Sequence, residues 1–223
     1  MAQHSKNGKL SRTALRRQRE KEQRYKTILT AAEKLFAQKG YPGTSMEEIA
    51  AVAEVSVGTV YFYFKNKEDL LIKLLDEIAF HLRELLGREF KKKDVQLEAF
   101  KLAGQSFIEN FYLKYPEKVL ILLRDAVGQG PVVEERRKVL YSRLCHDVHE
   151  ALLLVAKNMG FQYRSTVSAE VMAISIVGMF ERLAYHNLVW QEDSKDWRVI
   201  ADDAAYFIMG GINSLMDINP DVS

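Results

Sequence analysis

The stretch VSVGTVYFYFKNKEDL, residues 55–70, decides the fold of this chain. Ser56 precedes a short apolar segment and can accept a hydrogen bond from an early amide of a helix over residues 57–64, as an N-cap residue does. Val60 and Phe64 are four residues apart, so they share the face of that helix that packs inward. Asn66, with Asp69 three residues later, can cap a long helix that follows at once. The stretch therefore predicts a short helix, exposed over much of its surface, in front of a long one.

The residues before this stretch predict two further helices. Between Tyr25 and Phe36 the apolar residues are spaced by 3 and 4, and Gly40 can end that helix as a left-handed residue. The sequence SMEE at residues 45–48 has the pattern of a capping box, which begins a second, short helix. Two short helices joined by a three-residue turn, with a longer helix in front of them, form a helix-turn-helix, in which the second short helix enters the DNA major groove.

The rings of Tyr61, Phe62 and Tyr63 crowd the surface of the predicted recognition helix. Tyrosine hydroxyls and Thr59 can bond phosphate oxygens, while ring edges and methyl groups contact sugars and thymine methyls. Packing of some of these rings between neighbouring helices is the alternative. No Arg or Lys occurs between residues 44 and 64, so arginine contacts to guanine cannot come from the two short helices. Specificity is expected from van der Waals contacts, from DNA shape and from arginines of a basic arm in the minor groove.

These residues resemble the tetracycline-repressor (TetR) family of bacterial transcription regulators over a segment of about 45 residues. The matching stretches are ILTAAEKLF (28–36), KGY (39–41), TSMEEIA (44–50) and residues 55–70. The resemblance implies phosphate contacts from Thr44 and Ser45 at the start of the second helix and from Lys67 at the start of the fourth. It implies that the recognition helix contacts DNA through Ser56, Val57, Gly58, Thr59, Tyr61, Phe62 and Tyr63. Val57 and Tyr63 depart from the family pattern, where a basic residue and His are frequent, so direct guanine readout is weakened.

Helical spacing of apolar residues continues to the end of the chain. Five more helices are predicted, over about 94–114, 116–128, 131–159, 167–190 and 196–217. The predicted fold class is all-α, with about nine helices: an N-terminal three-helix helix-turn-helix domain and a C-terminal helical domain for ligand binding and dimerisation. The expected boundaries are a basic arm at 1–24, the DNA-binding domain at 25–70, the effector-binding and dimerisation domain at 71–217 and a tail at 218–223.

The formal net charge of +2 hides a strong asymmetry. Residues 1–26 carry nine Lys or Arg and two Glu, a charge of +7, which leaves −5 for the other residues. A basic segment on an acidic body predicts contact with a polyanion, and a solvated, disordered leader is the alternative. The longest apolar stretch, 171–180, is about half of the roughly 20 residues that span a membrane, and Cys145 has no partner for an intrachain disulfide. We expect a cytoplasmic protein without a membrane partner.

In the family named above, the C-terminal helices bind a small effector and pair two subunits. An apolar cavity for a small apolar or acyl-type effector is expected, lined by Phe100, Phe107, Phe111, Leu120, Leu123, Tyr141 and Leu144. Core packing explains each of these individually and is the alternative. Arg124 and Asp125 follow an apolar run, as do Glu181 and Arg182. These charges either pair with one another or, in the case of Arg124, recognise an acidic or acyl ligand.

Two features of the last helices predict a homodimer. Residues 171–190 are apolar on nearly every face, and two adjacent glycines lie inside the last helix at a cost of roughly 1 kcal/mol each. Close approach of helices across a subunit interface would compensate; a kink or packing within the chain is the alternative. The expected interface residues are Val177, Gly178, Glu181, Gly210, Gly211 and Leu215.

Other function classes have weaker support. His146 and His149 share a helix face, with His186 as a distant third ligand, but two histidines without a fixed carboxylate or Cys make a weak metal signal. We expect no metal, no cofactor and no enzyme, because no phosphate loop, nucleophile elbow or other catalytic pattern occurs. A membrane-surface or protein-interaction module is the other alternative, and the two capped short helices argue against it. The sequence predicts a homodimeric transcriptional repressor that a small, largely apolar effector releases from a palindromic double-stranded DNA operator.

Overall fold

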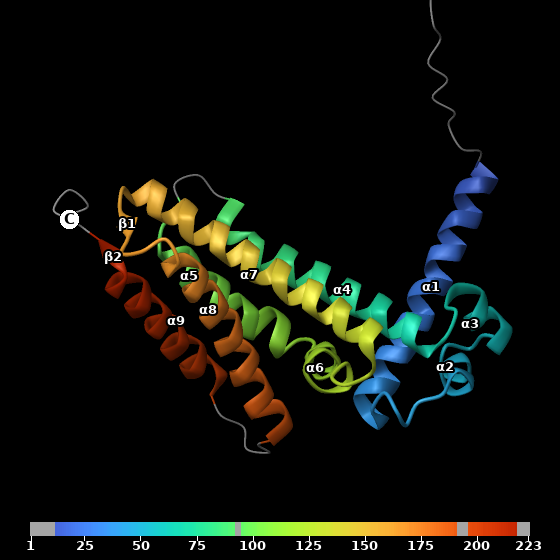
Figure 1. The fold of residues 1–223 in the computed structure, drawn as a ribbon. Coiled ribbons are helices and arrows are strands. Elements are labelled where there is room, and N and C mark those ends of the chain that lie inside the picture. Colours follow the sequence, from blue (N-terminus) through green and yellow to red (C-terminus); the bar gives the residue numbers. More distant parts are fainter. Residues whose placement is uncertain (1–11, 92–94, 191–195, 218–223) are drawn as a thin grey trace, which may run out of the picture. The chain divides into compact units, whose positions relative to one another are not determined.

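The computed structural model describes residues 12–91, 95–190 and 196–217, and it is all-α as predicted, apart from one short pair of strands (Figure 1). The α-helices are α1 (Arg12–Lys39), α2 (Met46–Val52), α3 (Val57–Tyr63), α4 (Lys67–Gly87), α5 (Glu98–Ser106), α6 (Pro116–Leu120), α7 (Pro131–Met159), α8 (Ser168–Tyr185) and α9 (Trp197–Ser214). A 3-10 turn, η1 (Glu89–Lys91), follows α4. The strands β1 (Gln162–Tyr163) and β2 (Met216–Asp217), which were not predicted, pair antiparallel.

Three of the predicted helices continue from α-helical into π-helical geometry. The π-helical segments are η2 (Phe107–Tyr112), η3 (Ile121–Asp125) and η4 (His186–Trp190), which follow α5, α6 and α8. π-Helical turns are rare and are found frequently at functional sites. All three lie in the part of the chain after α4.

The chain divides after Leu70 into two compact units, here called the N-terminal unit and the C-terminal unit. The N-terminal unit contains α1, α2, α3 and the first turn of α4. The rest of α4 and all later elements belong to the C-terminal unit. Helix α4 is therefore a continuous helix that contributes residues to both units.

The helix starts of the N-terminal unit are held by the side chains that the sequence predicts. Ser45 Oγ accepts from the Glu48 amide at 3.2 Å, and the Glu48 carboxylate accepts from the Ser45 amide at 3.0 Å, which completes the capping box of α2. Ser56 Oγ accepts from the Thr59 amide at 3.1 Å at the start of α3. Asn66 Oδ1 accepts from the Asp69 amide at 2.8 Å ahead of α4. Local sequence therefore fixes the start of each of these helices.

Helix α1 begins at Arg12 rather than near residue 25, so the alternative of a disordered leader does not apply to residues 12–24. These residues contain no Pro or Gly and are mostly strong helix formers. Ion pairs of the i, i+4 type, Arg16 with Glu20 and Glu22 with Lys26, add to helix stability. Lys6 and Lys9 of the predicted arm lie outside the described residues.

The turn between α2 and α3 has an unusual backbone at Glu54, whose φ is 55°. The Glu54 amide donates to Ala51 O and the Val55 amide to Ala50 O, which is the Schellman pattern of helix termination. Glycine is the usual residue at this left-handed position, because a side chain there costs roughly 1–2 kcal/mol. The sharp turn of the helix-turn-helix is therefore made at a cost in backbone strain.

We expect Glu54→Gly to raise the free energy of unfolding by about 0.5–1 kcal/mol, since relief of the strain exceeds the extra entropy of a glycine in the unfolded chain. Urea unfolding followed by circular dichroism measures this change. Glu54→Ala is the control, because it removes the same carboxylate but keeps a Cβ. An equal gain in both variants would show that charge, rather than backbone strain, sets the stability of this turn.

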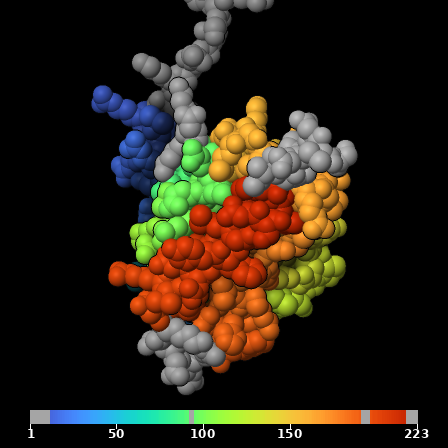
Figure 2. All heavy atoms as spheres, turned by 90° about the vertical axis from the view of Figure 1, so that its left-hand side faces the viewer, coloured from blue at the N-terminus to red at the C-terminus, as the bar shows by residue number. Residues whose placement is uncertain are grey.

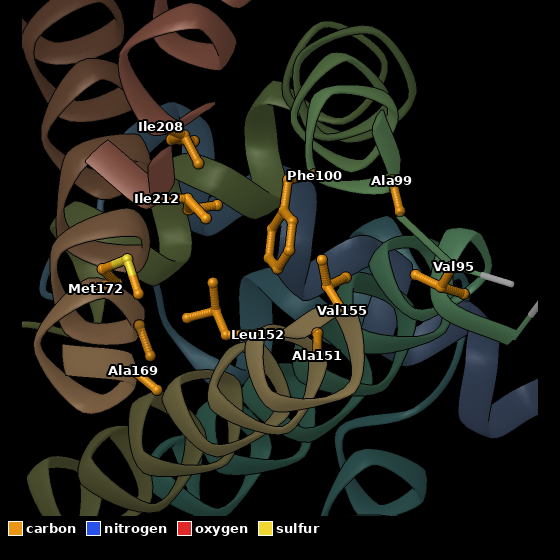
Figure 3. Packing of buried hydrophobic residues seen from close by; sticks show 11 residues of the cluster. Val95, Ala99, Phe100, Ala151, Leu152, Val155, Ala169, Met172, Ile208 and Ile212 are labelled. Carbon is orange, nitrogen blue, oxygen red and sulfur yellow. The ribbon is translucent and has the colours of Figure 1, made fainter. Parts of the chain in front are cut away.

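The core of the C-terminal unit joins residues from four helical segments (Figure 3). Phe100 lies at its centre together with Leu152 and Val155 of α7, Met172 of α8 and Ile212 of α9. Helix α7 packs along α8, and α5 packs along α9. Phe100 and Ile208 of this core also line a cavity within the C-terminal unit.

Candidate nucleic-acid interface and ligand cavity

Helix α3 is anchored on one face only. Val60 and Phe64 are buried as predicted, and the ring of Tyr25 on α1 stacks on Phe64 at a centroid distance of 5.1 Å. Tyr25 also meets Tyr63 edge-on at 6.2 Å. Tyr63 is therefore partly occupied in packing α3 against α1, which agrees with the packing alternative for this one ring.

The opposite face of α3 presents large apolar side chains. The exposed fractions of Tyr61 and Phe62 are 49% and 72%. Gly58 is exposed, and a Cβ built on it would meet only Ser56 Oγ, at 3.9 Å. Val57 and Thr59 are half-buried, and Ser56 is exposed with its oxygen bonded to Thr59. Core packing explains neither Phe62 nor Tyr61, so this face is available for contact with another molecule.

The positive charge of the N-terminal unit lies beside this face. Residues 12–26 of α1 carry seven Lys or Arg and two Glu, a charge of +5. The ammonium of Lys21 lies 5.9 Å from the centre of the Phe62 ring, so the basic segment of α1 reaches α3. α3 itself carries no charged residue. The geometry thus places an uncharged reading face next to a basic helix.

Thr44 and Lys67 are not placed as predicted. The side chain of Thr44 is buried, with 2% exposed, and its hydroxyl donates to Gly40 O at 3.0 Å. The ammonium of Lys67 donates to Thr44 O at 2.7 Å and Tyr41 O at 2.8 Å, with Pro42 O at 3.5 Å, and lies 4.5 Å from the centre of the Tyr41 ring. Burial lowers the pKa of Lys67. Both side chains brace the turn between α1 and α2 in this structure, and phosphate contacts from them stay a prediction.

An apolar cavity of about 100 Å³ lies inside the C-terminal unit. Of the predicted effector residues, Phe100, Phe107, Phe111, Leu123, Tyr141 and Leu144 line it. The sequence analysis missed the contribution of α4 and α8, which supply Leu82, Leu86, Ile176, Val177, Phe180, Glu181 and Ala184. A single water needs about 10–15 Å³ and two to four polar partners. This cavity is larger, and Tyr141 and Glu181 are the only polar side chains that the described residues contribute to its wall, so it suits an apolar ligand.

Two predicted effector residues lie outside this cavity. Val119, Leu122 and Leu123 line it at helical spacing, so Leu120, one residue further along than Val119, faces away. Arg124 lines a second, polar cavity next to the first. Its guanidinium forms a two-point ion pair with Asp125 at 2.9 and 3.0 Å, and Asp125 is 3% exposed. Arg124 thus compensates a buried carboxylate and also borders a cavity.

Gly104 of α5 decides how much of the apolar cavity remains open. A Cβ at this position would lie 2.9 Å from Phe180 Cζ, and the Phe180 ring also packs against Phe107 at 5.3 Å. An added methyl group must push the ring, and the free space into which it can move is the cavity.

We therefore expect Gly104→Ala to reduce affinity for long-chain apolar ligands more than for short ones. The unfolding free energy should change by less than about 1 kcal/mol, because better helix propensity offsets the crowding. Titration with straight-chain acyl compounds of increasing length measures the preference. Gly87→Ala is the control, since nothing lies within 4 Å of a Cβ there. An unchanged length preference in Gly104→Ala would contradict this assignment of the cavity.

Helices α8 and α9 both lie at the surface of the C-terminal unit (Figure 2), and both expose apolar side chains. The exposed residues are Val167, Val171, Ile174, Val199, Tyr206 and Phe207, with Phe207 the most exposed at 74%. Gly178, Gly210 and Gly211 are exposed on the same two helices, and nothing lies within 4 Å of a Cβ built on any of them. These glycines are therefore not required by packing within the described chain, which was the alternative for Gly210 and Gly211.

Three of the predicted interface residues face the interior of their own chain. Val177 and Glu181 line the apolar cavity, because they share a helix face with Phe180 and Ala184. Leu215 packs against the core of the C-terminal unit. The outward face of α8 is set by Val171, Ile174 and Gly178 instead, at a spacing of 3 and 4.

One group of possible metal ligands occurs among the described residues. Ligand atoms of His146, His149 and Glu150 lie within 4.8 Å of one another on α7, so Glu150 takes the place expected for His186. His186 instead meets the Trp190 ring at 5.9 Å. His146 and Glu150 are exposed, and nothing else in the structure points to an ion there.

The N-terminal unit is a helix-turn-helix, and this part of the chain is the part that comparison matches to a known family. Residues 28–74 match the family model described as bacterial regulatory proteins, tetR family. The chain is 37% identical to the fatty acid metabolism regulator protein of Bacillus subtilis (strain 168) over 84 residues, 38% of this chain and 43% of the relative. It is 33% identical to the transcriptional repressor NicS of Pseudomonas putida over 105 residues, 46% of this chain and 48% of the relative. The chain thus spans less than half the length of these curated relatives.

Solved structures share the whole fold at lower sequence identity. FadR of Bacillus subtilis, in complex with stearoyl-CoA, has a TM-score of 0.72 at 17% identity, over 84% of this chain and 98% of that one. AibR, in complex with isovaleryl coenzyme A and operator DNA, has a TM-score of 0.65 at 24% identity, over 82% and 97%. At these identities the likeness concerns the fold. No helix in the described part of the chain has the length and apolar character needed to cross a membrane.

Proposed function

We propose that this protein is a homodimeric, sequence-specific DNA-binding transcriptional regulator, and most simply a repressor. The observation that carries the proposal is the uncharged, aromatic outer face of α3. Phe62 is 72% exposed. Its helix is anchored by the Ser56 cap at its start and by the Tyr25 ring, which stacks on Phe64. A large exposed apolar side chain on a well-anchored helix indicates a contact surface. In a helix-turn-helix that surface is the one that enters the major groove.

The affinity for DNA is expected to come from α1 and its specificity from α3. Because α3 has no charged residue, phosphate contacts depend on Ser45, on helix-end amides and on the Arg and Lys of α1. An α-helix is roughly 10–12 Å across, whereas the minor groove is about 6 Å wide. Residues 12–24 therefore cannot lie in that groove as an extended arm would, and we expect them to contact the phosphate backbone.

The exposed face of α8 and α9 is the surface that we expect to pair two subunits. It combines large apolar residues such as Phe207 with three glycines that have open space around them. Glycine lets a second helix approach closely, and this offsets the roughly 1 kcal/mol that each costs inside a helix. Pairing also gives the two recognition helices that a palindromic operator needs, about 34–36 Å or more apart.

The apolar cavity is the proposed effector site. Its wall is mainly aromatic and aliphatic, and two proteins of the same fold have been solved in complex with acyl thioesters, isovaleryl coenzyme A and stearoyl-CoA. Helix α4 links this site to DNA binding: Leu82 and Leu86 line the cavity, and the same helix begins at Lys67, which braces the turn of the helix-turn-helix. A ligand that displaces these two leucines acts on a continuous helix, and this is how we expect effector binding to change the spacing of the recognition helices.

A gel-shift titration tests the proposal. The DNA fragment upstream of the gene is compared with a scrambled fragment of the same length over a range of salt concentrations. We expect specific binding at least about 1,000-fold tighter than non-specific binding, with affinity falling as salt rises. Equal affinity for both fragments at every salt concentration would contradict sequence-specific regulation and would favour a non-specific binder of polyanions.

A further inference from the structure

A second cavity adjoins the apolar one and has a different chemistry. Its volume is about 540 Å³, and its wall consists of Leu123, Arg124, Val127, Arg137, Gly178, Glu181, Arg182 and Tyr185. Leu123 and Glu181 also belong to the wall of the apolar cavity, so the two spaces meet at these residues. Three Arg and one Glu give the wall of this second cavity, here called the arginine pocket, a formal charge of +2.

The three guanidinium groups are held in different ways. Arg124 is fixed by its ion pair with the buried Asp125. Arg137 donates through one terminal nitrogen to Glu134 at 2.8 Å, and its side chain is only 15% exposed. The guanidinium carbon of Arg182 lies 4.2 Å from the centre of the Trp190 ring, a cation–π contact that holds this side chain.

Two polar atoms at this junction are buried without a hydrogen-bond partner among the described residues. They are Arg137 Nε and the hydroxyl of Tyr141, one helical turn further along α7. The guanidinium of Arg137 lies 5.8 Å from the centre of the Tyr141 ring. Burial raises the pKa of Tyr141, and so do the charge and the hydrogen-bonding interaction of Glu181, while Arg137 opposes the shift. The hydroxyl therefore keeps its proton, and Glu181 is the nearest acceptor for it within the described chain. A buried donor without an acceptor costs about 1–3 kcal/mol, so Arg137 Nε indicates a missing acceptor.

We propose that the effector is an amphipathic anion whose acidic group is held in the arginine pocket, chiefly by Arg137, while its hydrocarbon chain fills the apolar cavity. The inference rests on the proposed function and specifies the chemistry of its effector. A carboxylate or phosphate oxygen supplies the acceptor that Arg137 Nε lacks, and the planar guanidinium group offers two parallel donors to it. The hydrocarbon chain of the ligand would join its acidic group at the shared wall formed by Leu123 and Glu181.

The charge of Glu181 adds selectivity to this arrangement. Its carboxylate lies in the wall shared by both cavities and repels an anion in either of them. Three arginines offset this repulsion in the arginine pocket, whereas no described Lys or Arg lines the apolar cavity. The favoured orientation then places the ligand's hydrocarbon chain in the apolar cavity and its acidic group among the arginines.

Direct binding measurements on the full-length protein test the proposal. The probes are dodecanoate, dodecanoyl-coenzyme A, coenzyme A alone and the neutral dodecanol, measured by equilibrium dialysis and by tryptophan fluorescence, to which Trp190 contributes. At least one acyl anion should bind about 10-fold or more tightly than dodecanol, and only the anion should lose affinity as salt rises. Comparison of dodecanoate with the coenzyme A ester shows whether a carboxylate or a phosphate is the acidic group.

Variants assign the effect to the pocket. Arg137→Gln should remove the roughly 10-fold preference for the anion and leave dodecanol binding unchanged, and Arg137→Lys should restore part of it. Arg143→Gln is the matched control: it removes the same charge from an exposed position on the same helix, outside the arginine pocket. Circular dichroism confirms that each variant is folded.

Three results would overturn the proposal. Dodecanol could bind as tightly as dodecanoate and dodecanoyl-coenzyme A, or the preference for an anion could survive Arg137→Gln. The third is that none of the three probes with a dodecyl chain binds. Gel shifts on the same preparations keep this outcome separate from the proposed function. A protein that binds its operator specifically but none of these ligands would retain the regulatory role and lose only the assigned effector.

Discussion

Replacement of Gly211 by arginine is expected to convert the protein from a dimer to a monomer and to weaken specific DNA binding by about 100-fold or more. Nothing lies within 4 Å of a Cβ at this position, so the larger side chain fits the isolated chain without a clash. In the proposed dimer the same side chain would bury a charge where another helix approaches, which costs several kcal/mol. A monomer presents a single recognition helix and contacts only half of a palindromic site. The 10³–10⁷-fold preference that DNA-binding proteins show for specific sites over non-specific DNA depends on contacts with both halves.

Sedimentation at micromolar concentration and gel shifts measure the two effects. Gly87→Arg is the matched control, because it also places an arginine at a helical glycine with open space around it, but on α4. We expect this control to remain a dimer. A dimeric Gly211→Arg protein that binds the operator normally would remove α9 from the interface, and a monomeric wild type would exclude the proposed spacing of the recognition helices.

Replacement of Lys67 by methionine is expected to lower the unfolding free energy of the N-terminal unit by about 2–3 kcal/mol. The ammonium group donates to Tyr41 O and Thr44 O, which are part-buried, and methionine leaves these carbonyls without their charged partner. The turn before α2 then loses the brace that sets its geometry. Affinity for the operator should fall because the helix-turn-helix is less often folded.

The salt dependence of DNA binding distinguishes this structural role from a phosphate contact. Loss of a phosphate contact lowers the slope of log K against log salt by about 1. We expect Lys67→Met to leave the slope unchanged, because the ammonium already donates to carbonyls. Lys65→Met, which removes an exposed charge two residues earlier, is the control for stability and should leave unfolding unchanged. A slope lower by 1 with normal stability in Lys67→Met would restore the role that the sequence predicted.

Sequence by itself determined the features that depend on neighbours along the chain. Ser45 with Glu48, Ser56 and Asn66 cap their helices as predicted, because each contact joins atoms three residues apart. The burial of Val60 and Phe64 followed from their i, i+4 spacing alone. The all-α class and the order of the helices followed in the same way from spacing and from the positions of Pro and Gly.

Tertiary structure decided how side chains of the right type are used. Lys67 is in the sequence position of a phosphate-binding lysine, but carbonyls 23 to 26 residues away capture its ammonium. Val177 and Gly178 are adjacent in the sequence, yet Val177 lines the apolar cavity, whereas Gly178 is exposed and borders the arginine pocket. The apolar cavity and the arginine pocket each join residues from several helices, and they meet at Leu123 and Glu181, 58 residues apart in the chain. Helical periodicity tells which residues share a face, but only the packing of helices distant in sequence decides what each face meets.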